Sequence, residues 1–253
     1  GVRSEGTVAC WGYDSAGQAD PPSGAFASVT AGWSHTCGVR TDGTVACWGS
    51  DVHGQASPAS GTFLSVGAGS NHTCGVRTDG SVVCWGDSSY GQAVPSSGAF
   101  ASVSAGGPGW SPNMCGVQTD GTVACFGNDD FGQSSPLSGT FASVSAGWLH
   151  TCGTRNPGAV ECWGDDSNGQ ANPPAGTFLS TSAGSDHTCA VRTDETVACW
   201  GNDAYGQANP PSGTFVSVSA ATSYTCGVRT DGTVACWGNN DYAQSSPPSG
   251  TFA

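Results

Sequence analysis

The sequence contains no lysine, and its six basic residues are all arginine, against 19 acidic residues and a formal net charge of −13. Nucleic acids are bound by basic side chains that neutralise phosphates, and anionic membrane surfaces attract the same side chains. The composition therefore argues against both kinds of partner. No apolar run approaches the roughly 18 to 20 residues that span a bilayer, so membrane insertion is not expected either.

Helical patterns are also missing. No segment repeats its apolar residues at helical spacing, which excludes a stack of helical repeats. The chain instead contains 40 Gly and 14 Pro with a single Met, a composition typical of short strands joined by tight turns. These features predict an all-β protein.

Signatures of catalysis and of metal binding are absent from the sequence. It has no CxxC, HExxH or GxSxG motif, no phosphate-binding loop and no paired-carboxylate signature. We therefore expect no enzyme activity, no cofactor and no bound metal. Acidic loop residues raise the alternative of calcium, but none has DxDxDG spacing, so solvated turns are favoured and a chelator should leave thermal stability unchanged. Histidine precedes TC in four copies of one motif, and Asn113 and Tyr224 replace it elsewhere, a distribution that favours structural hydrogen bonding over catalysis: His35, His72, His150 and His187.

What the sequence does contain is a repeat of 37 residues, enlarged by four residues in its third copy. The thirteen cysteines recur with the period of the repeat, and twelve of them form pairs ten positions apart: Cys37 and Cys47, Cys74 and Cys84, Cys115 and Cys125, Cys152 and Cys162, Cys189 and Cys199, Cys226 and Cys236. Cys10 is left without a partner in this chain.

The paired cysteines flank a predicted hairpin. If residues 41–43 form a three-residue loop with Gly43 in the left-handed conformation, Val39 faces Val45 and Cys37 faces Cys47, where side chains approach closely. A disulfide fits this register without a backbone shift. Two opposed cysteines supply only half of a tetrahedral metal site, so metal binding is the weaker alternative. Regular disulfides indicate an extracellular protein, secreted or at the cell surface.

Each repeat contains four short segments with strand character, which is the pattern of a propeller blade. Units of the form SVxAGxxHTCGVRTDGTVxCWGxNxxGQ resemble the repeats of the regulator of chromosome condensation family over essentially the whole chain. The resemblance implies a seven-bladed β-propeller. The paired cysteines are a departure from the family pattern that is typical of secreted relatives. The propeller-type β-lactamase inhibitory protein, a secreted relative, is similar in its setting and in starting at the third strand of a blade. We therefore predict one domain over residues 1–253, a seven-bladed β-propeller of four-stranded blades with one disulfide per blade hairpin.

The repeats do not complete this predicted ring. Seven CWG-type segments occur but only six SVxAG segments, so we expect the last repeat to be incomplete and the ring-closing inner strand to be absent from the given chain. Either a further C-terminal segment or a neighbouring molecule would supply that strand. The second possibility would make the protein a polymer by strand addition.

The copies differ on only one side of the predicted propeller. The loop between the first and second strands and the loop after the third strand emerge together, and we call this side the variable face. The opposite side, the turn face, carries the RTDG turns and the PPSGTF links, which hardly vary. The variable face holds the candidate ligand-binding residues: Trp33, His53, Tyr90, Trp110, Phe131, Trp148, Tyr205 and Tyr242.

Exposed aromatics beside acids and amides are used by protein interfaces and by sugar-binding surfaces. The alternative is that each aromatic side chain has only a structural role and covers its own blade. This role is least expected for Trp110, because an inserted residue is not required for packing of the repeat. The sequence thus predicts an extracellular binding or scaffolding propeller for a protein or a glycan. Its alternatives are a fibre or coat subunit completed by strand exchange and an inhibitor of a secreted hydrolase. Asn71 begins an NHT glycosylation sequon that coincides with the repeat consensus.

Overall fold

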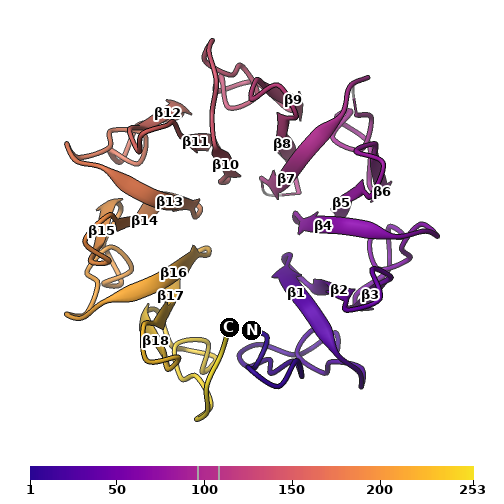
Figure 1. Ribbon diagram of the computed structural model, residues 1–253, viewed down its shortest axis with the longest axis horizontal. Helices are drawn as coiled ribbons and strands as arrows, with labels where there is room; N and C mark the ends of the chain where they lie inside the picture. The colour runs from indigo at the N-terminus through magenta and orange to yellow at the C-terminus, as the bar shows by residue number, and fades with distance from the viewer. Residues whose placement is uncertain (96, 108) are drawn as a thin grey trace.

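The computed structural model describes residues 1–95, 97–107 and 109–253, and over these residues the protein is all-β. Its 18 strands form six three-stranded antiparallel sheets, each ordered first, second, third strand in sequence. The sheets are set radially around a common axis, with both chain ends side by side in the ring (Figure 1). The repeated Val, Thr and Cys residues and the Gly-containing turns account for this series of short strands.

The strands fall into three groups by their distance from the axis (Figure 1). The inner strands are β1 (Phe26–Ala31), β4 (Phe63–Ala68), β7 (Phe100–Gly106), β10 (Ser143–Ala146), β13 (Phe178–Ala183) and β16 (Phe215–Ala220). The middle strands are β2 (His35–Arg40), β5 (His72–Arg77), β8 (Asn113–Gln118), β11 (His150–Thr154), β14 (His187–Arg192) and β17 (Tyr224–Arg229). The outer strands are β3 (Val45–Gly49), β6 (Val82–Gly86), β9 (Val123–Gly127), β12 (Val160–Gly164), β15 (Val197–Gly201) and β18 (Val234–Gly238).

The all-β class is confirmed, but the prediction of seven four-stranded blades is wrong: the described residues form six blades of three strands. The segment expected as a fourth strand after each GQ is a series of turns. Each of these segments contains one or two prolines, as at Pro58 and at Pro173 and Pro174. Proline donates no backbone hydrogen bond, so these segments cannot continue a ladder.

The expected seventh blade fails for a different reason. Residues 1–25 contribute only isolated bridges, between Val2 and Val8 and between Arg3 and Phe252. In each of the six sheets a disulfide joins the outer strand to the middle strand with which it pairs, whereas Cys10 of the first repeat forms no disulfide among the described residues. This segment nevertheless connects the last sheet with the first: the Trp11 indole donates to the Gln244 carbonyl at 3.0 Å, and Phe26 N–H donates to the Gly6 carbonyl at 2.8 Å.

The hairpin register expected from the turn is confirmed. Val39 pairs with Val45 and Cys37 with Cys47, and Gly43 has a φ of 84°. The same pairing recurs in the other sheets, so each of the six sheets contains one disulfide between its middle and outer strands. The presence of disulfides, inferred from the spacing, is thereby confirmed.

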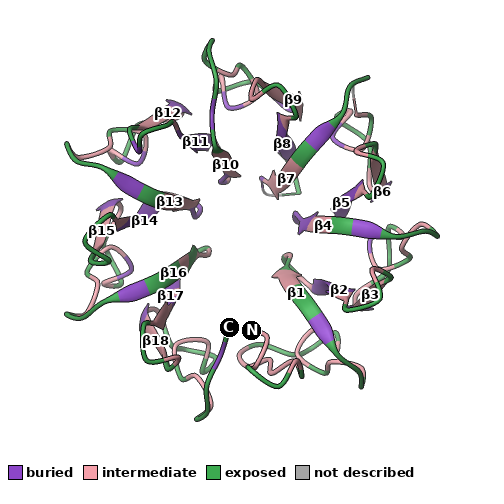
Figure 2. Cartoon of the chain, in the orientation of Figure 1, coloured by how far each residue is buried: buried purple, intermediate pink, exposed green. Residues whose placement is uncertain are grey.

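The core consists of layers between neighbouring sheets. The Cys37 disulfide of the first sheet packs against Phe63 and Trp85 of the second, and Cys189 packs in the same way against Phe215 and Trp237. Figure 2 shows the buried residues concentrated in the middle strands, which are covered from both sides. Each repeat therefore buries its apolar residues against the next repeat, as expected for a repeat architecture.

Candidate functional site

Two kinds of loop build the variable face, and backbone hydrogen bonds join them. The loop after an outer strand lies on the loop between inner and middle strands: Ser50 N–H donates to the Ser34 carbonyl at 2.8 Å, and Asp87 N–H donates to the Asn71 carbonyl at 2.8 Å. The face is therefore a rigid framework that presents whatever side chains the individual copies carry.

Three tryptophans from three different repeats meet on the inner side of this face. Trp33 and Trp148 come from the first and fourth sheets, yet their ring centroids lie 5.5 Å apart with planes inclined by 31°. With Trp110, Ser70, Asn71 and Gly109 they line a cavity of about 270 Å³. Trp33 and Trp110 stay 59% and 58% exposed. We call this site the tryptophan pocket.

The enlarged third repeat carries Trp110 to this pocket. Gly107 has a φ of 80° and donates its N–H to the Gly147 carbonyl at 2.9 Å, so the insertion is tied to the fourth sheet at its base. On the other side the Ser70 hydroxyl, which is buried, donates to the Gly107 carbonyl. The insertion thus bridges the second and fourth sheets and carries Trp110 between them. The inserted residue Pro108 lies outside the described residues.

The other five predicted ligand residues do not join the tryptophan pocket. They occupy equivalent turns after the outer strands, one turn in each of five repeats: His53, Tyr90, Phe131, Tyr205 and Tyr242. In each turn the backbone N–H of this residue donates to the side-chain carbonyl of the glutamine two positions later, at 2.8 to 3.0 Å. The fixed turn leaves the aromatic side chains exposed.

Sequence reasoning missed three contributors to this face. Ser70 and Asn71 line the tryptophan pocket, although only the sequon drew attention to Asn71. Tyr13 packs edge-on against Tyr242, with ring centroids 5.0 Å apart, and extends the exposed aromatic surface where the two chain ends meet. The available signal for Ser70 and Asn71 was their position, because they align with Trp33 and Ser34 in the first repeat.

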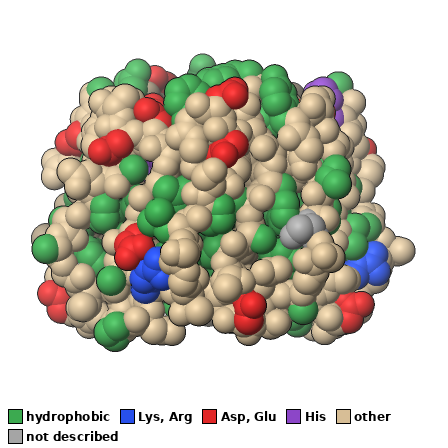
Figure 3. Space-filling model, turned by 90° about the horizontal axis from the view of Figure 1, so that it is seen from above, with side chains coloured by type: hydrophobic (Ala, Val, Ile, Leu, Met, Phe, Trp, Pro, Cys, Tyr) green, Lys and Arg blue, Asp and Glu red, His purple; other side chains and the backbone are tan. Residues whose placement is uncertain are grey.

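The charges are divided unequally between the two faces. The arginines lie at the turn face, where their guanidinium carbons stack over phenylalanine rings at 4.0 to 5.6 Å: Arg3, Arg40, Arg77, Arg155, Arg192 and Arg229. The loops of the variable face carry ten aspartates: Asp14, Asp51, Asp87, Asp129, Asp130, Asp165, Asp166, Asp186, Asp203 and Asp241. In the side view of Figure 3 the visible arginines lie in the lower half, whereas acidic side chains occupy both halves.

The aspartates of the outer turns act as local caps. Asp51 accepts the Ala56 N–H at 2.7 Å, and Asp203 accepts the Ala208 N–H at 2.8 Å. Among the described residues, no three His, Cys, Asp or Glu side chains converge as a metal site would require. Asp186 differs because it lies in a loop between inner and middle strands. Its burial, reinforced by Asp165, raises the pKa of its carboxyl group.

The four repeated histidines are fully buried between sheets. In three of them the ring Nε2 lies 2.8 Å from a threonine hydroxyl of the next sheet: His35 with Thr73, His150 with Thr188, His187 with Thr225. The fourth, His72, lacks this partner among the described residues, because Met114 stands where the other sheets have threonine. Burial lowers the pKa of all four to about 4.

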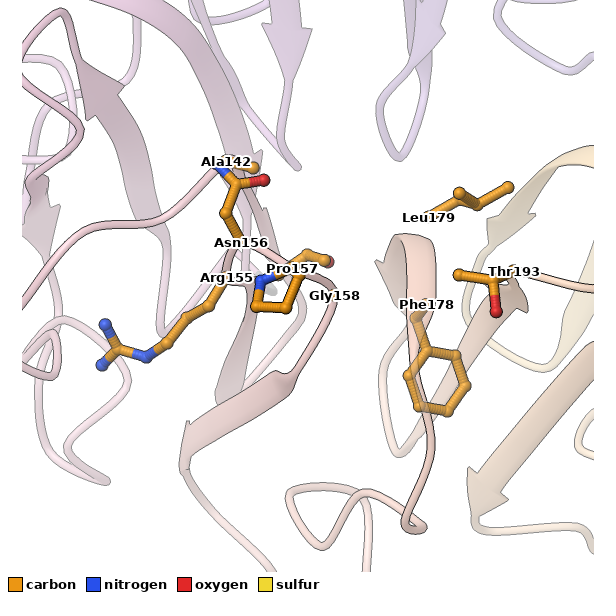
Figure 4. A pocket seen from close by; sticks show the side chains of 9 residues that line it. Ala142, Arg155, Asn156, Pro157, Gly158, Phe178, Leu179 and Thr193 are labelled. Atoms are coloured by element: carbon orange, nitrogen blue, oxygen red, sulfur yellow. The ribbon is translucent and has the colours of Figure 1, made fainter.

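The turn face departs from the consensus in several repeats: Gln118 replaces arginine in the third, Glu195 replaces glycine in the fifth, and the fourth has a different turn sequence. The fourth repeat reads TRNPG, and residues 154–158 border a cavity of about 180 Å³ with Phe178, Leu179 and Thr193 of the fifth sheet (Figure 4). Arg155 points away toward its own sheet, where it forms a 2.8 Å ion pair with Glu161. We assign this cavity no role.

Cys10 is the thirteenth cysteine and forms no disulfide within the described part of the chain. Its thiol is partly buried, and that burial raises its pKa. The described residues also include no helix that is both long enough and apolar enough to cross a membrane.

Five segments of the chain match the Regulator of chromosome condensation (RCC1) repeat, and together they cover more than half of its residues: 26–55, 63–92, 141–170, 178–207 and 215–244. The unmatched sheet is the third, which contains the insertion and the Phe126 and Met114 replacements. No curated protein sequence matches the chain.

Solved structures with the same fold include two plant receptor ectodomains. The ectodomain of the Physcomitrella patens receptor kinase CR4 is 27% identical, with a TM-score of 0.79 over 94% of this chain and 69% of that one. The CRINKLY WD40 ectodomain of the Arabidopsis thaliana receptor kinase ACR4 is 24% identical, with a TM-score of 0.71 over 84% of this chain and 85% of that one. Yeast RCC1 (Prp20), solved bound to Kap60, is 16% identical, with a TM-score of 0.74 over 90% of this chain and 73% of that one.

Proposed function

This chain belongs to the regulator of chromosome condensation (RCC1) repeat family, and we propose that it is a non-catalytic extracellular binding module whose variable face holds a protein partner. The observation that carries the proposal is the tryptophan pocket. Trp33, Trp110 and Trp148 come from separate repeats, meet at one place and leave two of their side chains more than half exposed. Large exposed aromatics around a cavity are typical anchors of protein interfaces.

The extracellular setting is supported by the six disulfides and by the likeness to the CR4 ectodomain. The non-catalytic assignment is supported by the four repeated histidines, His35, His72, His150 and His187. Each lies buried between sheets rather than in a cavity beside a nucleophile, whereas catalysis needs a base in reach of substrate.

The test uses Trp110→Ala, with Leu179→Ala as the matched control. Leu179 is similarly exposed but lies at the turn face. Each variant and the parent would be immobilised and used to capture proteins from the medium surrounding the source cells. The captured protein would then be purified and its affinity measured by calorimetry. We expect Trp110→Ala to weaken binding by at least tenfold, since interface hot spots cost about 2 kcal/mol or more. Leu179→Ala should leave the affinity unchanged.

Equal affinity of Trp110→Ala and the parent would contradict the proposal. The alternative functions, a glycan receptor, a hydrolase inhibitor and a fibre subunit, predict different results in these experiments. A glycan receptor would lose binding when the captured material is deglycosylated, and a hydrolase inhibitor would capture one enzyme and abolish its activity. A fibre subunit would elute as a polymer in size-exclusion chromatography, whether or not Trp110 is replaced.

A further inference from the structure

We propose that the tryptophan pocket receives an arginine side chain from a partner protein with a basic surface. This inference rests on the proposed function and names the chemistry of its partner. It comes from two independent properties of the variable face: the composition of the pocket wall and the sign of the charge around it.

The pocket wall is built for a flat or cationic group. Three of its six lining residues are tryptophans, and the planes of Trp33 and Trp148 are inclined by only 31°. The face of an indole ring carries negative electrostatic potential and attracts a cation within about 6 Å, more strongly than any other aromatic side chain. A guanidinium group is planar and stacks on such rings, and it is more weakly hydrated than an ammonium group.

The polar groups of the wall favour a donor. Asn71 lines the pocket, with its side-chain amide near Gly109, and an amide carbonyl can accept a hydrogen bond from a guanidinium N–H. The Ser70 hydroxyl already donates to the Gly107 carbonyl. No carboxylate lines the pocket, so a lysine ammonium would enter without an ion-pair partner and would lose its hydration. These features favour arginine over lysine.

The charge around the pocket has the sign that attracts a cation. Ten aspartates lie in the loops of this face, and the six arginines lie at the turn face, engaged with phenylalanine rings. Asp186 is the one acid in the loops between inner and middle strands, the kind of loop that also carries the three tryptophans. A surface potential of one sign draws a partner of the opposite sign and accelerates association, with a strong dependence on salt. An uncharged glycan or an apolar side chain would gain nothing from this field.

The experiment titrates the intact chain with three blocked tripeptides that differ only in the central residue: arginine, lysine and citrulline. Citrulline has almost the shape of arginine but no charge. Binding would be followed by the indole N–H signals in NMR spectra and by quenching of tryptophan fluorescence. We expect the arginine peptide to bind about 3- to 30-fold more tightly than the citrulline peptide, the range that cation–π energies give. The lysine peptide should fall between them.

The variants locate the effect. Trp110→Ala and Trp33→Ala should each abolish the difference between arginine and citrulline, and Leu179→Ala should preserve it. Asp186→Asn should weaken the arginine peptide about two- to threefold and leave citrulline unaffected, and added salt should act in the same direction.

The two proposals fail separately. If binding of the purified partner depends on Trp110 but the arginine and citrulline peptides bind equally, the arginine assignment is overturned, and the proposal that the variable face binds a protein is retained. If the arginine peptide binds Trp110→Ala as well as it binds the parent, the pocket is not its site and the assignment is likewise overturned. If replacing Trp110 does not change the affinity for the purified partner, the proposal that the variable face binds a protein is contradicted as well.

Discussion

The two faces of this propeller use the same repeat for opposite purposes. At the turn face five of the six sheets share one arrangement, with an arginine over the phenylalanine ring of its own sheet, and most of their turns contain a glycine in the left-handed conformation. At the variable face the backbone is equally regular, yet the side chains change from copy to copy, and three tryptophans from separate copies meet. The difference teaches that the constant residues stack the sheets, while the variable residues are free to form a site.

If the constant residues stabilise the sheets, acidification should have the largest effect on the free energy of unfolding, because it protonates the histidines buried between the sheets. The buried histidines have folded pKa values of about 4, below the usual 6.5, so the unfolded chain binds more protons once the pH falls below 6.5. The stability they provide is complete above pH 6.5 and is lost as the pH falls toward 4. Between pH 7 and 5 we expect a loss of up to about 2 kcal/mol per histidine, measured by urea unfolding at each pH.

A matched variant and a second pH window test this origin. His150→Asn carries the residue that the third repeat has at this position, Asn113, and should reduce the loss between pH 7 and 5. The exposed turn aspartates, such as Asp42, act in a lower window. Hydrogen bonds from threonine lower the pKa of Asp42 below 3.8, so its contribution disappears only below that pH. An unfolding free energy that stays constant from pH 7 to 5 would contradict the prediction.

The next largest effect should follow from opening one layer between sheets. Phe63 is buried, contacts Trp85 edge-on at 6.1 Å between ring centroids and packs on the Cys37 disulfide of the first sheet. Phe63→Ala should lower the free energy of unfolding by about 3 to 5 kcal/mol, the usual cost of removing a buried phenylalanine. Chemical denaturation monitors this directly. Binding measured below the melting temperature should remain unchanged, and a loss of binding by the folded variant would show that the two faces are not independent.

The smallest effect on stability should come from the site itself. Trp110 is more than half exposed and lies in an insertion, so Trp110→Ala should change the free energy of unfolding by less than about 0.5 kcal/mol. Its melting curve should overlay that of the parent while its binding is lost. A large drop in melting temperature would show that Trp110 supports the packing of the second and fourth sheets, and would remove the distinction between framework and site.

Much of the fold could be predicted because its causes are local. The TDG turn sets the hairpin register, and this register places each cysteine opposite its partner, as at Cys37 and Cys47. The number of strands could not be predicted as easily, since the segments after GQ combine strand-like residues with prolines. There the missing N–H of residues such as Pro58 prevented a fourth strand.

The candidate site was predictable as a face but not as a pocket. Alternation of strand direction places Trp33, Trp110 and Trp148 on one side, and comparison of the copies marks them as unusual. Their convergence depends on how far each loop reaches over the axis, which the spacing of the repeats does not reveal. Five further aromatics met the same sequence criteria and remain apart.

The sequence alone determined the repeat, its disulfide-bonded hairpins and the division into a constant and a variable face, because turns and strand alternation act over a few residues. Only the tertiary structure decided that six sheets form and that Trp33 and Trp148, 115 positions apart, lie with their rings 5.5 Å from each other. The reason is that closing the sheets around one axis brings distant repeats together, and that closure is a property of the whole ring.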